Sequence, residues 1–233
     1  MGGVGGTPAA ARPPASSTDP AQAHAAALPW ARAAKAAGRH TLIIVFEGQF
    51  AYSSSYASRI YAYQEALRRG EDPSRPLHTG LSFVSTGLIV PHVRETMGTA
   101  ELLILPETSE NATVSVGSEA GRAWHEVHGA DSKIVIVGHS LGGWSALQCG
   151  NKLNRFQVPV ASVLTMDART YTANYQYFIK SPNVTGPHRN YFQKSLVFPG
   201  YEIRGAENTH LHIDHARIPG APEVVAAYLA MVR

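Results

Sequence analysis

The residues best suited to chemistry in this chain form the pentapeptide 138–142, Gly-His-Ser-Leu-Gly, which fits the pattern Gly-x-Ser-x-Gly. An apolar run of strand length, residues 133–137, precedes it, and helical spacing follows up to Leu153. A serine in such a strand-to-helix turn has a strained backbone, and the flanking glycines let neighbouring segments approach closely. The N-terminus of the helix also offers a backbone amide to a developing oxyanion. We therefore predict that Ser140 is a nucleophile and that the amide of Leu141 is an oxyanion donor.

A serine hydroxyl needs a base, and that base needs an acid to orient it. Two aspartates follow Ser140 in the chain, Asp167 and Asp214. Asp167 ends the apolar segment 158–166, one helix and one strand after the serine, so we expect it at the same carboxyl edge of a sheet. Asp214 lies next to the candidate bases in sequence, which leaves little freedom to orient one of them. We predict Asp167 as the acid, with Glu202 as the fallback.

Three histidines, His210, His212 and His215, follow the last predicted strand and are candidates for the base. The order Ser, Asp, His, each after a successive strand, resembles the α/β-hydrolase superfamily, specifically its lipase and esterase branches. The resemblance covers residues 40–233 in organisation, and its sharp motif is residues 138–143. The catalytic histidine of many relatives lies in a stretch of the form His-x-x-Ile-Asp, so the resemblance implies His210 as the base. His215 is the next candidate, and His212 is expected to be a neighbour in the pocket.

The resemblance also implies where the remaining groups lie. Most relatives place the acid two strands after the nucleophile, whereas Asp167 follows the very next strand, an arrangement that also occurs among lipases of the superfamily. A second oxyanion donor is expected from the loop after an early strand. Residues 46–49, Phe-Glu-Gly-Gln, look like the His-Gly-x turn of the family, with Glu47 in the place of its histidine. The amide of Gln49 is then the second donor.

The same histidine cluster also fits a different chemistry, that of a metal site. Residues 210–215 spell His-x-His-x-Asp-His, which resembles the metal-binding signature of the metallo-β-lactamase superfamily, where two zinc ions activate water. That signature comes early in its superfamily and further ligands follow it, whereas no histidine or aspartate follows His215. We therefore expect no metal and no organic cofactor, and keep a metal-dependent hydrolase as an alternative. A non-enzymatic module on a hydrolase fold is disfavoured by the complete set of Ser, Asp and His.

Apolar segments of strand length alternate with stretches of helical spacing from His40 onward. Strands are predicted at 41–46, 102–105, 133–137 and 158–166, a hairpin at 195–198 with 201–204, and helices at 56–69, 118–128, 140–153 and 222–231. Continuous apolar strands between helices indicate an α/β fold with a mainly parallel sheet and helices on both faces. The resemblance makes this the α/β-hydrolase fold. Residues 49–100 and 168–200 are the expected sources of a cap that selects the substrate.

The first 38 residues differ in composition from the rest of the chain. They are rich in Gly, Ala and Pro, so residues 1–38 are predicted to be a flexible tail and residues 39–233 a single catalytic domain. Within the tail, residues 31–37 are the one stretch expected to form a short helix. The tail has no continuous apolar segment of the kind found in secretory signals, so no signal peptide is predicted, and a cytoplasmic or a secreted location stays open.

Composition narrows the classes of partner. Hydrophobic residues make up 44% and charged residues 16% of the chain, as in globular proteins. The net charge is +3 and the basic residues are scattered, so no nucleic-acid partner is expected. The longest apolar runs are far too short to span a bilayer. Cys149 is the single cysteine, which excludes an internal disulfide.

These observations predict a serine hydrolase, an esterase or lipase, that cleaves carboxylic esters through an acyl-enzyme. A small-molecule ester or a lipid is the expected substrate. A thioesterase or an acyltransferase on the same three residues is an alternative, because the choice among these reactions depends on the shape of the pocket. The sequence specifies neither the acyl chain length, the leaving group nor the oligomeric state.

Overall fold

The computed structural model describes residues 19–48, 85–97, 100–105, 110–170, 180–195 and 199–233, and the single residues 62, 66 and 69. Its centre is one sheet of six parallel strands in the order β2-β1-β3-β4-β5-β6. The strands are β1 (Thr41–Phe46), β2 (Ala100–Leu105), β3 (Lys133–His139), β4 (Ser162–Met166), β5 (His188–Phe192) and β6 (Glu207–His210). The longer helices are α1 (Pro20–Ala36), α4 (Glu110–His128), α5 (Leu141–Arg155) and α6 (Pro222–Val232), and α3 (Val93–Met97) is short. The prediction of an α/β fold with a mainly parallel sheet is confirmed.

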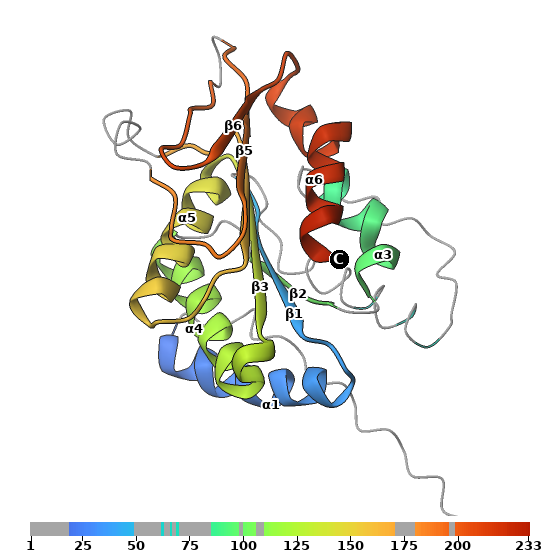
Figure 1. The fold of residues 1–233 in the computed structure, drawn as a ribbon, viewed down its shortest axis with the longest axis vertical. Helices are drawn as coiled ribbons and strands as arrows, with labels where there is room; N and C mark the ends of the chain where they lie inside the picture. The colour runs from blue at the N-terminus through green and yellow to red at the C-terminus, as the bar shows by residue number, and fades with distance from the viewer. Residues whose placement is uncertain are drawn as a thin grey trace, which may run out of the picture.

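The sheet is covered on both faces, as Figure 1 shows, with α1, α4 and α5 on one side and α3 and α6 on the other. All six residues of β1 are buried. Leu42 and Ile44 of this strand pack into the core beneath α1, α4 and α5, whereas Ile43 and Val45 pack into the core beneath α6. Because successive side chains of a strand point to opposite faces, a strand covered on both sides needs an unbroken apolar run.

The helix α1 lies inside the segment that the composition predicted to be a flexible tail. Asp19 caps it by accepting a hydrogen bond from the amide of Ala21 at 2.9 Å, and Pro20 occupies its first position. Its small side chains let it approach α4 closely, and Trp30 packs against Trp124 with ring centroids 5.5 Å apart. The residues that it buries are Ala23, Ala27, Trp30, Ala31 and Ala34. The prediction of a tail is therefore wrong for residues 20–36. The alanines that suggested a linker recur at helical spacing and form the face of α1 that packs on α4.

The last two strands also differ from the prediction. β5 and β6 are parallel to each other and to the rest of the sheet. The predicted hairpin of 195–198 with 201–204 is wrong, because residues 201–203 form no strand and Arg204 makes only an isolated parallel bridge with Lys180. Residues 196–198 lie outside the described part of the chain.

The strands that the apolar pattern missed are joined to β4 by polar side chains, of which Thr165 and Asn190 are buried and Asn208 is exposed. Thr165 of β4, Asn190 of β5 and Asn208 of β6 are in register across three neighbouring strands. The hydroxyl of Thr165 donates to Asn190 Oδ1 at 3.0 Å, and Asn190 Nδ2 donates to Asn208 Oδ1 at 2.8 Å. We call these three residues the polar ladder. Strands built in this way carry no apolar run for a hydrophobic pattern to detect.

The remaining predicted elements divide into those that the structure describes and those that it does not. The helices predicted at 118–128, 140–153 and 222–231 correspond to α4, α5 and α6, and α4 begins eight residues earlier, at Glu110. Apart from residues 62, 66 and 69, the predicted helix at 56–69 lies outside the described residues, as do most residues of the predicted cap segments. Among the helices that the structure describes, none is long and apolar enough to cross a membrane.

Candidate active site

Ser140 lies in the turn between β3 and α5, at the carboxyl edge of the sheet. Its backbone has φ 56° and ψ −124°, a conformation that is costly for a residue with a side chain. Neighbouring backbone groups hold it there: its N–H donates to the carbonyl of Met166 at 2.9 Å, and its own carbonyl accepts from the amides of Gly143 and Arg169 at 3.0 and 2.9 Å. The strained strand-turn-helix geometry expected for a nucleophilic serine is present at this position.

The glycines around Ser140 are required by close backbone approaches. A Cβ on Gly138 would overlap the carbonyl oxygen of Gly142, and a Cβ on Gly142 would overlap the carbonyl oxygens at the end of β1. A Cβ on Gly48, just after β1, would lie 3.2 Å from the Cβ of Ser140. The turn after β1 therefore lies directly against the serine.

Asp167 follows β4 and is completely buried. Its φ is 46°, and its N–H donates to the carbonyl of Tyr191 at 2.8 Å. The carboxylate accepts three hydrogen bonds: Oδ1 from the amide of Gln193 at 2.8 Å, and Oδ2 from Gln193 Nε2 at 3.0 Å and from His215 Nδ1 at 2.8 Å. A Cβ on Gly200 would overlap Oδ1, so a glycine there leaves room for the carboxylate. These three donors fix the orientation of the carboxylate.

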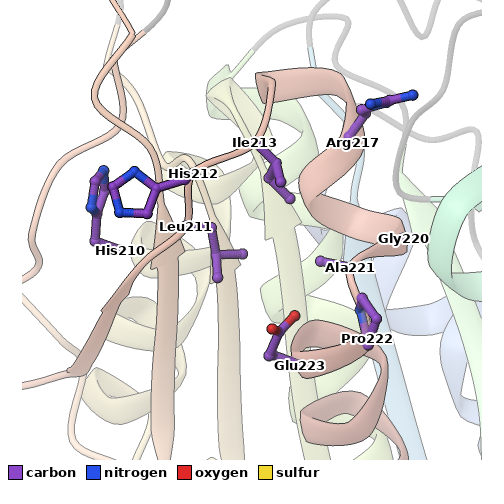
Figure 2. A pocket seen from close by; sticks show the side chains of 9 residues that line it. All are labelled: His210, Leu211, His212, Ile213, Arg217, Gly220, Ala221, Pro222 and Glu223. Carbon is purple, nitrogen blue, oxygen red and sulfur yellow. The ribbon is translucent and has the colours of Figure 1, made fainter.

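The histidine beside Asp167 is His215, whereas the sequence favoured His210. His215 begins the 3₁₀ helix His215–Gly220, and its side chain is 18% exposed. His210 is the last residue of β6, paired in register with Phe192, and it is exposed like the other three residues of that strand. Its ring packs against Phe192 and, as Figure 2 also shows, against His212, with ring centroids 5.5 and 4.4 Å apart. The structure thus brings His215, and not His210, to Asp167, because β6 still holds His210 and the chain turns back toward Asp167 only after it.

His139, the residue before Ser140, contacts His215 from a second direction. It is buried, its ring centroid is 4.4 Å from that of His215, and its Nε2 lies 3.0 Å from the carbonyl oxygen of His215. A carbonyl only accepts, so Nε2 carries the proton and donates. Burial, and secondly the nearby His215, lowers the pKa of His139 to about 3, so this ring is neutral. Sequence reasoning missed this residue, although its place in the pentapeptide put it beside the serine.

Of the two predicted oxyanion donors, the structure describes Leu141 but not Gln49. Leu141 is the first residue of α5, so its amide is at the N-terminus of that helix. Gln49 lies outside the described residues. Glu47 is buried, and its amide donates to the carbonyl of Leu105 at 3.0 Å. Glu202, the fallback acid, is exposed on an irregular segment.

An open pocket of about 540 Å³ lies between the end of β6 and the start of α6, as shown in Figure 2. Its lining consists of His210, Leu211, His212, Ile213, Arg217, Gly220, Ala221, Pro222 and Glu223. Ser140 and Asp167 are absent from this lining, so the pocket is not the site of the serine. Within the described parts of the chain, no three His, Cys, Asp or Glu residues are grouped so that they could hold a metal ion.

Comparisons with known proteins assign the chain to no family. No protein-family model matches the chain, and no curated protein matches it either. The geometry of Ser140, Asp167 and His215 is therefore the observation from which a function can be argued.

Proposed function

We propose that this protein is a serine hydrolase of the α/β-hydrolase type that cleaves carboxylic esters through an acyl-enzyme. The observation that carries the proposal is the 2.8 Å hydrogen bond between His215 Nδ1 and the buried Asp167, at the sheet edge where Ser140 occupies its strained turn. The chain order Ser, Asp, His, with each residue after a parallel strand, is the order of α/β-hydrolases. Backbone bonds from Met166 and Arg169, which flank the acid, also bring Ser140 beside it.

The proposed reaction uses the tautomer that Asp167 selects. A proton on His215 Nδ1 donates to the carboxylate, which makes Nε2 the basic nitrogen. Nε2 takes the proton of Ser140 as Oγ attacks the ester carbonyl, and then delivers it to the leaving alcohol. A water molecule, activated by the same nitrogen, cleaves the acyl-enzyme and releases the acid.

Two kinds of charge develop during these steps, and each has a proposed counterpart. The imidazolium of His215 forms next to the carboxylate of Asp167, which stabilises it without taking its proton. The oxyanion of the tetrahedral intermediate is assigned to the amide of Leu141 at the start of α5 and to the amide of Gln49 after β1. The closeness of Gly48 to Ser140 supports the assignment of the turn after β1 to this role.

The hydrogen bond between His215 and Asp167 weakens the metal-dependent alternative. That alternative requires His210, His212, Asp214 and His215 to bind metal together. Instead His215 faces Asp167, while His210 and His212 pack together at the end of β6. The thioesterase and acyltransferase alternatives use the same Ser140 chemistry and differ only in the acyl acceptor or leaving group.

The direct test is covalent labelling with a fluorophosphonate, followed by intact-mass measurement, with and without EDTA. We expect one adduct on the wild type that EDTA leaves unchanged and that Ser140→Ala abolishes. Ser145→Ala, a buried serine one turn along α5, is the matched control and should keep the adduct. The absence of an adduct on folded wild-type protein would refute the acyl-enzyme, and ester hydrolysis lost in EDTA would favour the metal-dependent alternative. A panel of oxygen esters and thioesters then ranks the leaving groups.

A further inference from the structure

Gln193 is the side chain that the proposed chemistry has not used, although it touches the candidate acid twice. It lies one residue beyond β5 and is 2% exposed. Its backbone amide donates to Oδ1 of Asp167 at 2.8 Å, and its side-chain Nε2 donates to Oδ2 at 3.0 Å. One residue thus spans both oxygens of the carboxylate.

The orientation of the Gln193 amide is fixed by a third contact. Its Oε1 accepts a hydrogen bond from the amide of Ser195, so the nitrogen end must face Asp167. The backbone carbonyl of Gln193 also accepts from the amide of Gly200 at 2.8 Å, and Gly200 itself lies against Asp167 Oδ1. The donor is therefore held in place before any substrate binds.

We infer that Gln193 is a positioning residue that aligns Asp167 for His215; this inference rests on the proposed function. Oδ2 accepts from both Gln193 Nε2 and His215 Nδ1, so the glutamine sets the direction from which the carboxylate meets the imidazole. Gln193 thereby holds the carboxylate of Asp167 against His215, where the positive charge forms in the proposed reaction.

This role predicts an effect on the chemical step and not on substrate binding. Gln193 touches the acid, and the acid touches the base, so Gln193 acts two contacts away from the reacting atoms. Replacing a residue that hydrogen-bonds a functional side chain without touching the reacting atoms typically lowers activity about 10- to 100-fold. The loss should appear in kcat, with KM nearly unchanged.

Two substitutions test the inference, and both are compared with wild type by ester hydrolysis after circular dichroism has verified the fold. Gln193→Met keeps the length of the side chain and removes the Nε2 donor, so we expect kcat to fall about 10- to 100-fold. Gln22→Met, at an exposed position of α1, is the control and should leave kcat unchanged. Gln193→Glu keeps the shape but places a second carboxyl against Asp167. Two carboxyls in contact share a proton, so the acid limb of the kcat/KM profile should move.

The pH profile separates positioning from a merely structural role, because a loss of packing lowers activity without moving the acid limb. If Gln193→Met fails to fold, the profile of the isosteric Gln193→Glu decides the question. Unchanged kcat in Gln193→Met, or an unmoved limb in Gln193→Glu, would overturn the inference while the wild type still reacts with fluorophosphonate. A wild type that neither labels nor hydrolyses esters would instead refute the proposed function.

Discussion

The two halves of the sheet are held together by different kinds of interaction, and the candidate site lies where they meet. In the first half, β1, β2 and β3 are apolar runs buried on both faces. In the second half, the polar ladder of Thr165, Asn190 and Asn208 joins β4, β5 and β6. Ser140 follows β3 of the first half, whereas Gln193 follows β5 and His215 follows β6 of the second half.

The two halves of the sheet should therefore differ in how well they tolerate substitutions. An apolar strand tolerates variation in its side chains as long as volume and pattern are kept. A buried polar group depends on individual donors and acceptors, because an unpaired partner left in the core costs about 1–3 kcal/mol. The second half is therefore the half in which single substitutions of polar side chains should reveal specific dependence.

The largest effect should separate the two candidate bases, His210 and His215. We expect His215→Gln to lower kcat about 10⁴-fold or more, since it removes the base that Asp167 orients. His210→Gln should leave kcat nearly unchanged, because its ring packs on Phe192 and His212 at the exposed end of β6. Steady-state ester hydrolysis and the rate of fluorophosphonate labelling measure both. A larger loss in His210→Gln than in His215→Gln would contradict the assignment of the base.

The next effect tests the apolar half at its closest backbone approach. Gly142→Ala places a Cβ against the carbonyl oxygens of Phe46 and Glu47, where only backbone movement can relieve the overlap. We expect a loss of about 2–3 kcal/mol in the free energy of unfolding, together with loss of labelling at Ser140. Gly129→Ala is the control: its added Cβ meets nothing within 4 Å, and only its φ of 61° is unfavourable. It should cost about 1 kcal/mol in urea unfolding and leave labelling intact. Equal losses in the two variants would show that the turn adjusts.

The third effect compares the two halves directly. Ile44→Ala leaves a cavity in the apolar core, and Asn190→Ala leaves Thr165 and Asn208 without their shared partner. Each should lower the free energy of unfolding by about 2–3 kcal/mol. Amide hydrogen exchange should distinguish them, with protection lost throughout the sheet for Ile44→Ala and first in β5 and β6 for Asn190→Ala. Uniform loss of protection in Asn190→Ala would show that the polar ladder does not form a separate unit.

The same division explains how much of the fold the sequence predicted. The strands of the first half and β4 were found from apolar runs, and the turn at Ser140 was found because a strand, two glycines and a helix adjoin there. Asp167 was placed at the same edge as Ser140, where the structure has it. β5 and β6 were missed because His188–Phe192 and Glu207–His210 are largely polar, and their stability depends on partners distant in sequence.

The candidate site divides in the same way. The choice between His210 and His215 depends on where the chain turns back after β6, and local spacing carries no information on that turn. Gln193 could not be predicted, because it follows a strand that was itself not predicted. α1 shows the converse case: a composition typical of linkers concealed alanines at helical spacing that pack on α4.

The smallest effect concerns acid pH and the buried histidine of the polar half. His188 lies with Nε2 3.0 Å from Thr165 Oγ1 and Nδ1 2.8 Å from Ser181 Oγ, and burial lowers its pKa to about 4. The unfolded chain therefore binds a proton at a pH where the folded chain does not, so stability is full above pH 6.5 and falls as the pH drops toward 4. At pH 5 this histidine should contribute a loss of about 2 kcal/mol relative to pH 7. Urea unfolding at both pH values should show a smaller difference in His188→Gln than in wild type. His212→Gln, at an exposed position after β6, is the control and should retain the wild-type difference. An undiminished difference in His188→Gln would assign the acid sensitivity to the buried His139 and His128, because burial lowers the pKa of both.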